Sequence, residues 1–159
     1  MDVLVRGRLT TLRPADGDDV DRLVAWHADP EVSRYWDDET FTRAQTVERL
    51  ARPDVDAWIV EENGEPVGYL QSWTDDGETS GLDMFLVPAA RGRRLGPDAA
   101  RALALHLLDE VGRTRVTVDP YSWNEGAIRG WQRAGFVEVG RQPPRGEQSA
   151  ETVQMEFRR

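Results

Sequence analysis

The strongest structural signal in the chain lies in GLDMFLVPAARGRRLGPDAARALALHLL, residues Gly81 to Leu108. A short apolar run leads into an arginine-rich turn, and Gly96 and Pro97 then open a helix. Proline suits the first helical position because its missing N–H would be unpaired there anyway. Apolar residues recur with the spacing of one buried helical face, at Ala99, Ala102, Leu103, Leu105 and Leu108. We therefore predict a strand, a basic turn and a packed amphipathic helix.

The turn between this strand and helix is a candidate anion site. A Gly- and Arg-rich turn that feeds a helix N-terminus presents unpaired backbone N–H groups and the positive end of the helix dipole. Arg91, Arg93 and Arg94 add positive charge at the same place. Two interpretations follow from the residues alone, a pyrophosphate-binding turn or an ordinary basic connection.

Length and composition predict one soluble domain over residues 1–159. A chain of 159 residues is long enough to bury about two-thirds of its unfolded surface. It contains no cysteine, so disulfides and thiolate metal ligands are excluded. No apolar run approaches the roughly 20 residues that span a bilayer, and the N-terminus lacks a signal-peptide core. We expect a cytoplasmic protein with no membrane partner and no bound metal.

The net charge of −9 is unevenly distributed. Residues 1–90 hold 20 acidic side chains against 8 arginines, a net of −12, and residues 91–159 hold 9 against 12, a net of +3. An acidic half beside a basic half fits a protein that brings a cationic ligand to an anionic one, although solubility alone also explains such asymmetry. A strongly acidic chain repels phosphates, so nucleic acid is not an expected partner.

The other elements are predicted from periodicity, caps and turn residues. Asn63-Gly64 indicates a hairpin, and Gly135 indicates the C-terminal cap of a helix. We expect strands at 8–13, 57–61, 66–73, 81–87, 115–118, 136–139 and 152–157, and helices from residue 16 or 18 to about 28, at 42–52 and at 124–134, besides the long helix from 96 to 108.

Three acidic features are candidates for binding a cation. Tyr35 and Trp36 precede residues 37–39, Asp-Asp-Glu, and the stretch offers ring faces and carboxylates together, although an exposed helix end with two core aromatics explains it equally well. The loop 74–80 carries Asp75 and Asp76, and Asp83 lies within an apolar strand. A carboxylate in such a strand is costly unless it faces a cleft or has a partner, so both catalysis and a structural ion pair explain Asp83.

The order of these elements, with two motifs, resembles the GCN5-related N-acetyltransferase (GNAT) family. The motifs are R-G-R-R-L-G at residues 91–96 and N-x-x-A-I-x-x-W-x-x-x-G-F at 124–136. The resemblance implies an α/β (α+β) fold whose mixed, mostly antiparallel sheet is flanked by helices and splayed between two central strands for acetyl-CoA. It implies that this co-substrate contacts Phe85, Leu86, Val87, Arg91, Gly92, Arg93, Arg94, Leu95, Gly96, Pro97, Asn124, Ala127 and Trp131.

Two positions depart from the family pattern. Arg94 stands where the first motif glycine is usual, which is compatible with cofactor binding if Arg94 keeps an ordinary helical or turn conformation. Trp131 stands where many members have a tyrosine general acid, and an indole cannot serve in that role. Tyr121 is the nearest tyrosine in sequence. A thiolate leaving group, with a conjugate-acid pKa of about 8.5, departs without a strong acid.

Within the family, the chain is most similar to the aminoglycoside 6′-N-acetyltransferases and their siderophore-biosynthesis relatives. The segments are N-G-E-P-V-G-Y-x-Q-S at 63–72, G-L-D-M-F-L at 81–86, Asp119-Pro120 and A-I-R-x-W-x-x-A-G-F at 127–136. The resemblance implies that Asp83 is the catalytic base or an anchor for the amine. It also implies that Asp119 contacts an amino sugar and that Trp36, Asp75 and Asp76 line the acceptor cleft.

The expected function is therefore acetyl transfer from acetyl-CoA to a primary amine of a polycationic small molecule, the 6′-amine of aminoglycoside antibiotics. An amine must lose a proton before it attacks a thioester, and Asp83 could accept it. Backbone N–H groups of residues 84–87 could hold the thioester oxygen. The alternatives are a siderophore-type or other small-molecule N-acyltransferase, and an inactive CoA-binding member of the fold. The expected state is a monomer or a homodimer.

Overall fold

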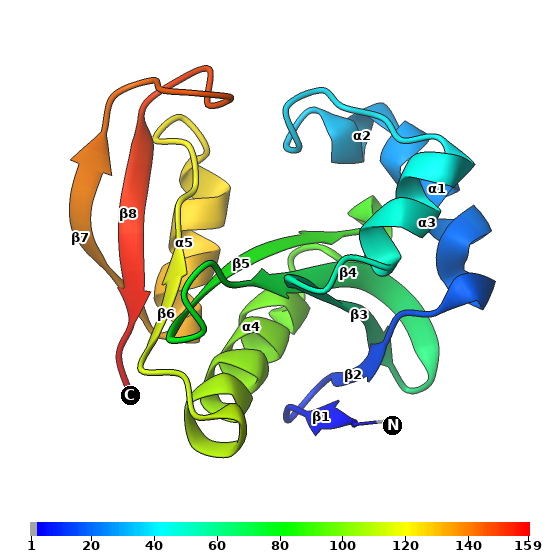
Figure 1. Cartoon of the computed structure of the whole chain (residues 1–159), viewed down its shortest axis with the longest axis horizontal. Coiled ribbons are helices and arrows are strands. Elements are labelled where there is room, and N and C mark those ends of the chain that lie inside the picture. The colour runs from blue at the N-terminus through cyan, green and yellow to red at the C-terminus, as the bar shows by residue number, and fades with distance from the viewer. Residues whose placement is uncertain (1–2) are drawn as a thin grey trace.

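The computed structural model describes residues 3–159 and contains one curved sheet with helices on both faces (Figure 1). The described strands are β1 (Val5–Arg6), β2 (Thr11–Pro14), β3 (Val55–Glu62), β4 (Glu65–Trp73), β5 (Thr79–Leu86), β6 (Arg115–Val118), β7 (Phe136–Gln142) and β8 (Thr152–Phe157). The helices are α1 (Val20–Ala28), α2 (Pro30–Ser33), α3 (Arg43–Leu50), α4 (Leu95–His106) and α5 (Glu125–Ala134). Short turns of other helical types are η1 (Gly17–Asp19), η2 (Pro88–Ala90) and η3 (Leu107–Val111).

The sheet is mixed and splays at its centre, as the sequence predicts. Its strand order is β1-β2-β3-β4-β5-β6-β8-β7, and every neighbouring pair is antiparallel except β5 and β6. These two parallel strands pair only where residues 79–81 meet 115–117. Beyond Gly81, β5 continues to Leu86 against β4 alone among the described strands. The separation of β5 from β6 opens the sheet at the point where the quoted strand approaches its basic turn.

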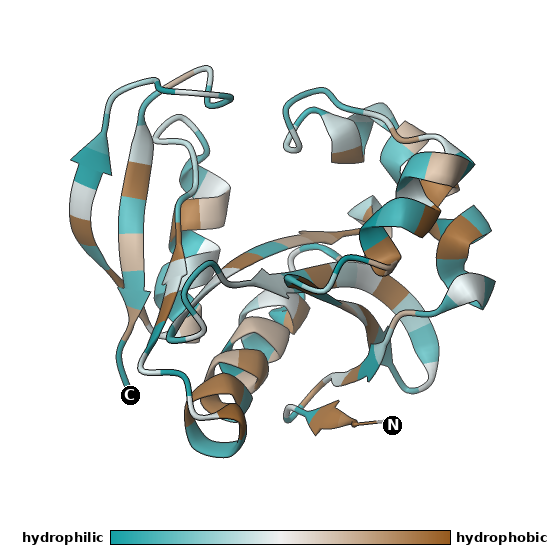
Figure 2. Ribbon diagram, in the orientation of Figure 1, coloured by the Kyte–Doolittle hydropathy of each residue, from teal (hydrophilic) through white to brown (hydrophobic). Residues whose placement is uncertain are grey.

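Side chains of β5 alternate between two apolar clusters. Leu82, Met84 and Leu86 pack with α4 in the larger cluster, which also receives α5. Phe85 packs on the other face with Tyr69 and with residues of α1 and α2. The alternation predicted for this strand is therefore confirmed. The same period-two pattern is visible as colour bands along β8, whose apolar residues are buried (Figure 2).

Local signals placed several element boundaries correctly. Thr42 and Gln45 form the expected capping box at the start of α3, and Asn63-Gly64 turns the β3–β4 hairpin with both φ angles positive, 51° and 80°. Gly135 ends α5 in the left-handed region with φ of 116°. Strands β6 and β8 have the predicted bounds.

Several predicted boundaries were wrong by one to three residues, and tertiary contacts explain one of them. The first main strand begins at Thr11 rather than at residue 8, because the N–H groups of Arg8, Leu9 and Thr10 donate to the Asp98 carboxylate instead of a neighbouring strand. Helix α4 begins at Leu95, which puts Pro97 at the third helical position rather than the first. That position is still free of an intrahelical N–H bond, so the proline is tolerated.

Within residues 3–159, no helix is both long enough and apolar enough to cross a bilayer.

Candidate active site

A groove of about 890 Å³ lies between β5, the turn before α4, and α5. It occupies the place where β5 and β6 separate. Eleven of the thirteen residues predicted to contact a cofactor line it: Phe85, Leu86, Arg91, Gly92, Arg94, Leu95, Gly96, Pro97, Asn124, Ala127 and Trp131. The two motifs, about 30 positions apart in sequence, therefore form opposite walls of one groove.

Val87 and Arg93 lie outside the lining of this groove. The N–H of Val87 donates to the Val67 carbonyl at 2.9 Å, which prolongs the β4–β5 pairing. Arg93 turns its guanidinium to Glu62 on β3, with 2.7 Å between Nη1 and Oε1. The side chain of Arg93 therefore braces the turn against the sheet.

Backbone direction along β5 selects which N–H groups face the groove. Since the Val87 N–H points to β4, the alternating geometry of a strand directs the Phe85 N–H to β4 as well. The N–H groups of Met84 and Leu86 then point to the opposite edge, from which β6 has moved away. Of the predicted donors in residues 84–87, these two are the ones placed to meet a ligand.

The turn before α4 has an unusual backbone. Gly92 has φ of 77°, and Arg94 is in the left-handed region with φ of 65° and ψ of 14°. Arg94 therefore does not meet the condition, an ordinary helical or turn conformation, under which the departure from the motif is compatible with cofactor binding, and it adopts instead a left-handed conformation that favours glycine. A residue other than glycine in the left-handed conformation destabilises the fold by roughly 1 kcal/mol. At Arg94 this conformation redirects the chain from the turn into α4.

Arg91 braces this turn from inside. Its Nη2 donates to the carbonyl of Glu31 in α2 at 2.6 Å, and its Nε donates to the carbonyl of Leu86 at 3.3 Å. The guanidinium therefore joins α2 to the end of β5. Since Arg91 and Arg93 are bonded to protein groups, the groups of this turn that are placed to bind an anion are the backbone N–H groups at the α4 N-terminus and the side chain of Arg94.

Asp83 lies on the face of β5 opposite α4 and is held by a chain of hydrogen bonds. Gln71 donates from Nε2 to Asp83 Oδ2 at 3.1 Å, and its Oε1 accepts from the Tyr69 hydroxyl at 2.7 Å. Burial raises the pKa of Asp83, and Asp37 acts in the same direction, while Gln71, Trp73 and Arg49 partly oppose the shift. A partly buried carboxyl with a raised pKa is suited to accepting a proton.

Asp119 follows β6, and its pKa is affected by the charge of Asp83. Burial and the charge of Asp83 raise the pKa of Asp119 to about 6, against a hydrogen bond from Gln148 Nε2 at 2.8 Å. The negative charge of Asp83 therefore acts on Asp119, and a bound ammonium group would relieve that repulsion.

Asp37 is a third member of this group that sequence reasoning did not single out. It raises the pKa of both Asp83 and Asp119, and its Oδ1 accepts a hydrogen bond from the Tyr121 hydroxyl. Asp37 follows α2 and Tyr121 follows β6, so this bond joins the two sides of the splayed sheet. The acid-rich run 37–39 was visible in the sequence, but nothing in it indicated which carboxylate turns inward.

The comparisons with known proteins agree with this geometry. The family model described as acetyltransferase (GNAT) domain matches residues 9–137. This chain belongs to the GNAT acetyltransferase family. It is 32% identical to the aminoglycoside N(6′)-acetyltransferase type 1 of Klebsiella pneumoniae and to that of Serratia marcescens, over 82% of this chain and 75% of each relative.

Solved GNAT structures give the same result. The chain is 28% identical to AAC(6′)-Ib in a complex with paromomycin and acetyl-CoA, with a TM-score of 0.83 and coverage of 95% of this chain and 94% of that one. A complex of AAC(6′)-Ib with ribostamycin and coenzyme A is 29% identical, with the same TM-score and coverage. The protein is an acetyl-CoA-dependent N-acetyltransferase, with acetyl-CoA as its co-substrate.

The remaining residues predicted for the GNAT acceptor side are dispersed. Trp36 packs by its edges on His27 and Phe85, with ring centroids 5.4 Å and 5.8 Å away. Asp76 accepts from the N–H groups of Glu78 and Thr79, each at 2.8 Å, and these bonds lower its pKa. Asp75 is exposed. Among residues 3–159, no hydrogen bond or ion pair joins Asp75 or Asp76 to Asp83 or Asp119.

Trp131 occupies the groove wall at the usual GNAT tyrosine position. It is buried and packs against Phe136 with ring centroids 5.3 Å apart. The Tyr121 hydroxyl instead donates a hydrogen bond to Asp37, and burial together with that bond raises the pKa of Tyr121. The described residues also contain no group of three His, Cys, Asp or Glu side chains arranged to hold a metal ion.

Proposed function

We propose that the protein transfers the acetyl group of acetyl-CoA to the 6′-amine of an aminoglycoside. The observation that carries this proposal is the electrostatic coupling of Asp37, Asp83 and Asp119 beside the groove. An aminoglycoside carries several ammonium groups, so it can relieve several carboxylates at once. The relatives at 32% identity are named for the same reaction.

The groove fits the co-substrate that the family uses. We assign the pyrophosphate to the turn 91–97, where backbone N–H groups open α4, and the pantetheine arm to the unpaired edge of β5. Gly92 keeps the turn in a left-handed conformation, and Asn124 caps α5 by accepting the Ala127 N–H at 3.2 Å. These features leave the thioester near Met84, one residue from Asp83.

Asp83 acts as the base in this proposal. Its carboxylate takes a proton from the bound ammonium, and the amine nitrogen then forms a bond to the thioester carbon. The carbonyl oxygen gains charge as that bond forms, and the N–H groups of Met84 and Leu86 face the place where it lies. The C–S bond breaks with the electron pair on sulfur, the nitrogen loses its second proton, and the departing thiolate takes up that proton, so that no proton donor is needed at Trp131.

Asp119 and Asp37 bind further ammonium groups of the same acceptor. Trp36 supplies an apolar wall through its packing on Phe85. Asp75, which is exposed, is assigned an outer contact with a long acceptor. We give Asp76 the role of shaping the loop, since its carboxylate already accepts two backbone N–H groups.

The decisive experiment is an acceptor panel read by release of free thiol from acetyl-CoA. The panel contains aminoglycosides with a 6′-amine, matched aminoglycosides with a hydroxyl at that position, a linear polyamine and a hydroxylamine derived from lysine. Thiol release should require the 6′-amine, and mass spectrometry with NMR should place one acetyl group there. Release with the polyamine or hydroxylamine but with no aminoglycoside would overturn the proposal.

A further inference from the structure

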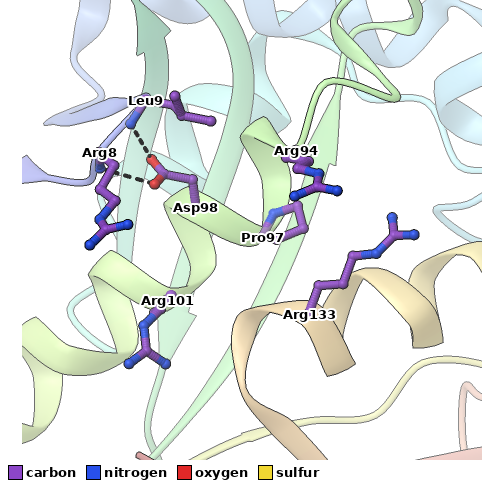
Figure 3. Close-up of a pocket in the computed structure, with 7 residues that line it drawn as sticks. All are labelled: Arg8, Leu9, Arg94, Pro97, Asp98, Arg101 and Arg133. Carbon is purple, nitrogen blue, oxygen red and sulfur yellow. Dashed lines mark hydrogen bonds between the residues drawn. The ribbon is translucent and has the colours of Figure 1, made fainter.

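An arginine without a carboxylate partner lies on the acceptor side of the sheet. Arg49 is in the last turn of α3, one of the three helices that cover the face of the sheet opposite α4 (Figure 1). No ion pair within residues 3–159 involves Arg49, although its side chain is partly buried. The arginines drawn in Figure 3 lie instead with α4, around a cavity that adjoins the cofactor groove. Arg49 is therefore separate from that basic cavity.

Aromatic rings and a neutral histidine hold the Arg49 guanidinium in place. Its Cζ lies 4.0 Å from the centroid of the Phe41 ring, and 5.8 Å and 6.0 Å from those of Trp36 and Tyr69. Its Nη1 lies 3.4 Å from Nε2 of His27, which is buried. A guanidinium only donates, so Nε2 accepts, which assigns the proton of the neutral ring to Nδ1. Burial, followed by the charge of Arg49, lowers the pKa of His27 to about 4, so neither the rings nor the histidine cancels the charge of Arg49 at pH 7.

A chain of hydrogen bonds connects this cluster to Asp83. The Tyr69 hydroxyl donates to Gln71 Oε1 at 2.7 Å, and Gln71 Nε2 donates to Asp83 Oδ2 at 3.1 Å. Burial raises the pKa of Tyr69 to about 12, so its hydroxyl stays protonated at neutral pH. Gln71 is opposite Asp83 in the register of β4 with β5, and Tyr69 is two residues away on β4, so these side chains share one face of the sheet. Arg49, which lies over Tyr69, is on that face too.

Charges of both signs act on Asp83. Burial raises its pKa most, and the negative charge of Asp37 raises it further. The positive charge of Arg49 lowers it, as do Gln71 and Trp73. At pH 7 the ionisable groups named around Asp83 are therefore two carboxyls, two neutral groups and one cation: Asp37, Asp119, Tyr69, His27 and Arg49.

We propose that Arg49 is a positioning residue for the catalytic base: its fixed charge keeps the Asp83 carboxylate ionised in the free enzyme, able to accept a proton from the acceptor. This inference rests on the role proposed above for Asp83. A direct ion pair would occupy the carboxylate oxygens that must receive the amine, whereas a charge held on aromatic rings acts through space and leaves them free. A bound ammonium group supplies positive charge of its own, so the effect of Arg49 is largest before the acceptor binds.

The first test is an NMR titration of the Asp83 side-chain carboxyl carbon in the protein without ligands, assigned with Asp83→Asn. In Arg49→Gln this carboxyl should titrate at a higher pH than in the wild type, because the charge that opposes burial is gone. Arg49→Lys keeps the charge and should titrate close to the wild type. Arg43→Gln removes a charge from an exposed site on the same helix and should titrate as the wild type does. Arg49→Met keeps an apolar chain against the rings and repeats the test if Arg49→Gln is unstable.

The second test is the pH dependence of kcat/KM with an aminoglycoside that has a 6′-amine, because kcat/KM reports on ionisable groups of the free enzyme. The titration of the acceptor itself is common to all variants and cancels from the comparison. Relative to the wild type, Arg49→Gln should lose about fivefold in kcat/KM at about pH 6 and less than about twofold at about pH 9. The change in kcat should be smaller, since the bound ammonium replaces the missing charge.

The outcomes separate this inference from the proposal on which it rests. An Asp83 carboxyl that titrates at the same pH in the wild type and in Arg49→Gln would overturn the role of Arg49. So would a loss of kcat/KM that is equal at every pH, which indicates a structural defect, or an Arg49→Lys variant as impaired as Arg49→Gln. A shifted titration with an unshifted rate profile would remove Asp83 as the base, and this inference with it. Absence of thiol release with every aminoglycoside would refute the proposed acceptor, whereas the titration, which needs no acceptor, decides whether Arg49 keeps Asp83 ionised.

Discussion

Asp83 is the single residue on which the proposed chemistry depends most. Asp83→Asn keeps the size of the side chain and removes its charge and basicity. If Asp83 is the base, turnover should fall by roughly 10²-fold at neutral pH and partly recover at high pH, where more of the amine is already free. Steady-state kinetics across pH measure this. Asp56→Asn, an exposed change of equal charge on β3, is the control and should retain wild-type turnover.

The kinetic constants distinguish the other roles of Asp83. A raised KM with normal turnover would show that the carboxylate anchors the amine and that another group, or water, removes its proton. A lower melting temperature with both constants impaired would indicate a structural partner. A stable variant with normal kinetics would eliminate Asp83 from every proposed role.

Asp119 should destabilise the free protein at neutral pH. Its pKa is raised from 3.8 to about 6, so folding favours the protonated form. The resulting stability is present below about pH 4 and is lost as the pH rises through 6. Asp119→Asn mimics the protonated carboxyl at every pH. At about pH 8 its free energy of unfolding should therefore exceed that of the wild type by roughly 1–2 kcal/mol, and its melting temperature should be higher. Near pH 4 the two proteins should be equally stable.

Asp76→Asn provides a control with the opposite sign. Backbone N–H groups lower the pKa of Asp76, so its carboxylate stabilises the fold above pH 3.8 and that stability is lost as the pH falls. This variant should be less stable than the wild type at about pH 8 and approach it in acid. A shift of the same sign in both variants would contradict the burial and charge effects assigned to Asp119.

At the scale of elements, the junction of β5 and α4 depends on Gly96. A Cβ at this position would lie 3.3 Å from Met84 Cε and 3.5 Å from Leu86 Cδ1, both on β5. The glycine therefore permits close packing of the helix on the strand. Gly96→Val should push the α4 N-terminus outward, cost about 1–3 kcal/mol of stability and weaken coenzyme A binding.

Gly96→Ala is the matched variant for this junction. The methyl group meets the flexible ends of two side chains, so a shift of a few tenths of an ångström accommodates it. Denaturant unfolding and calorimetry with coenzyme A should show a small effect for Ala and a large one for Val. Equal effects would mean that Gly96 is needed for its backbone, and no effect of Val would remove the packing argument.

The elements around this junction were predictable because their signals are local. The capping box at Thr42, the Asn63-Gly64 turn and the Gly135 cap each depend on residues adjacent in sequence. The extended residues predicted from Arg8 failed because Asp98, 90 positions away, captures their N–H groups. The left-handed backbone of Arg94 was equally unpredictable, since arginine gives no local indication of it.

At the scale of the whole molecule, the sequence predicted the fold and the residues that line the cofactor groove better than the residues proposed to bind the acceptor. The groove residues belong to two contiguous motifs, so a family pattern finds them together. The proposed acceptor carboxylates, Asp37, Asp83 and Asp119, come from three separate segments. Their electrostatic interaction depends on the folded structure and is not visible in any one segment of the sequence. The sequence therefore indicated the acidic run 37–39 as a candidate for binding a cation but could not single out Asp37 within it.

The charge distribution of the whole chain leads to the last prediction. Residues 1–90, with a net charge of −12, supply Asp37 and Asp83, and the basic remainder supplies most of the cofactor groove. Salt screens exposed charges beyond about 10 Å at 0.1 M ionic strength, so the long-range attraction for a polycation should weaken as salt is added. The KM of an aminoglycoside should therefore rise several-fold between about 0.02 M and 0.2 M salt, whereas that of a monoamine acceptor should change little. Asp37→Asn should weaken this dependence without altering the response to acetyl-CoA, because Asp37 is one of the charges on the acceptor side. A KM independent of salt would exclude a polycationic acceptor and favour a neutral or hydroxylamine substrate.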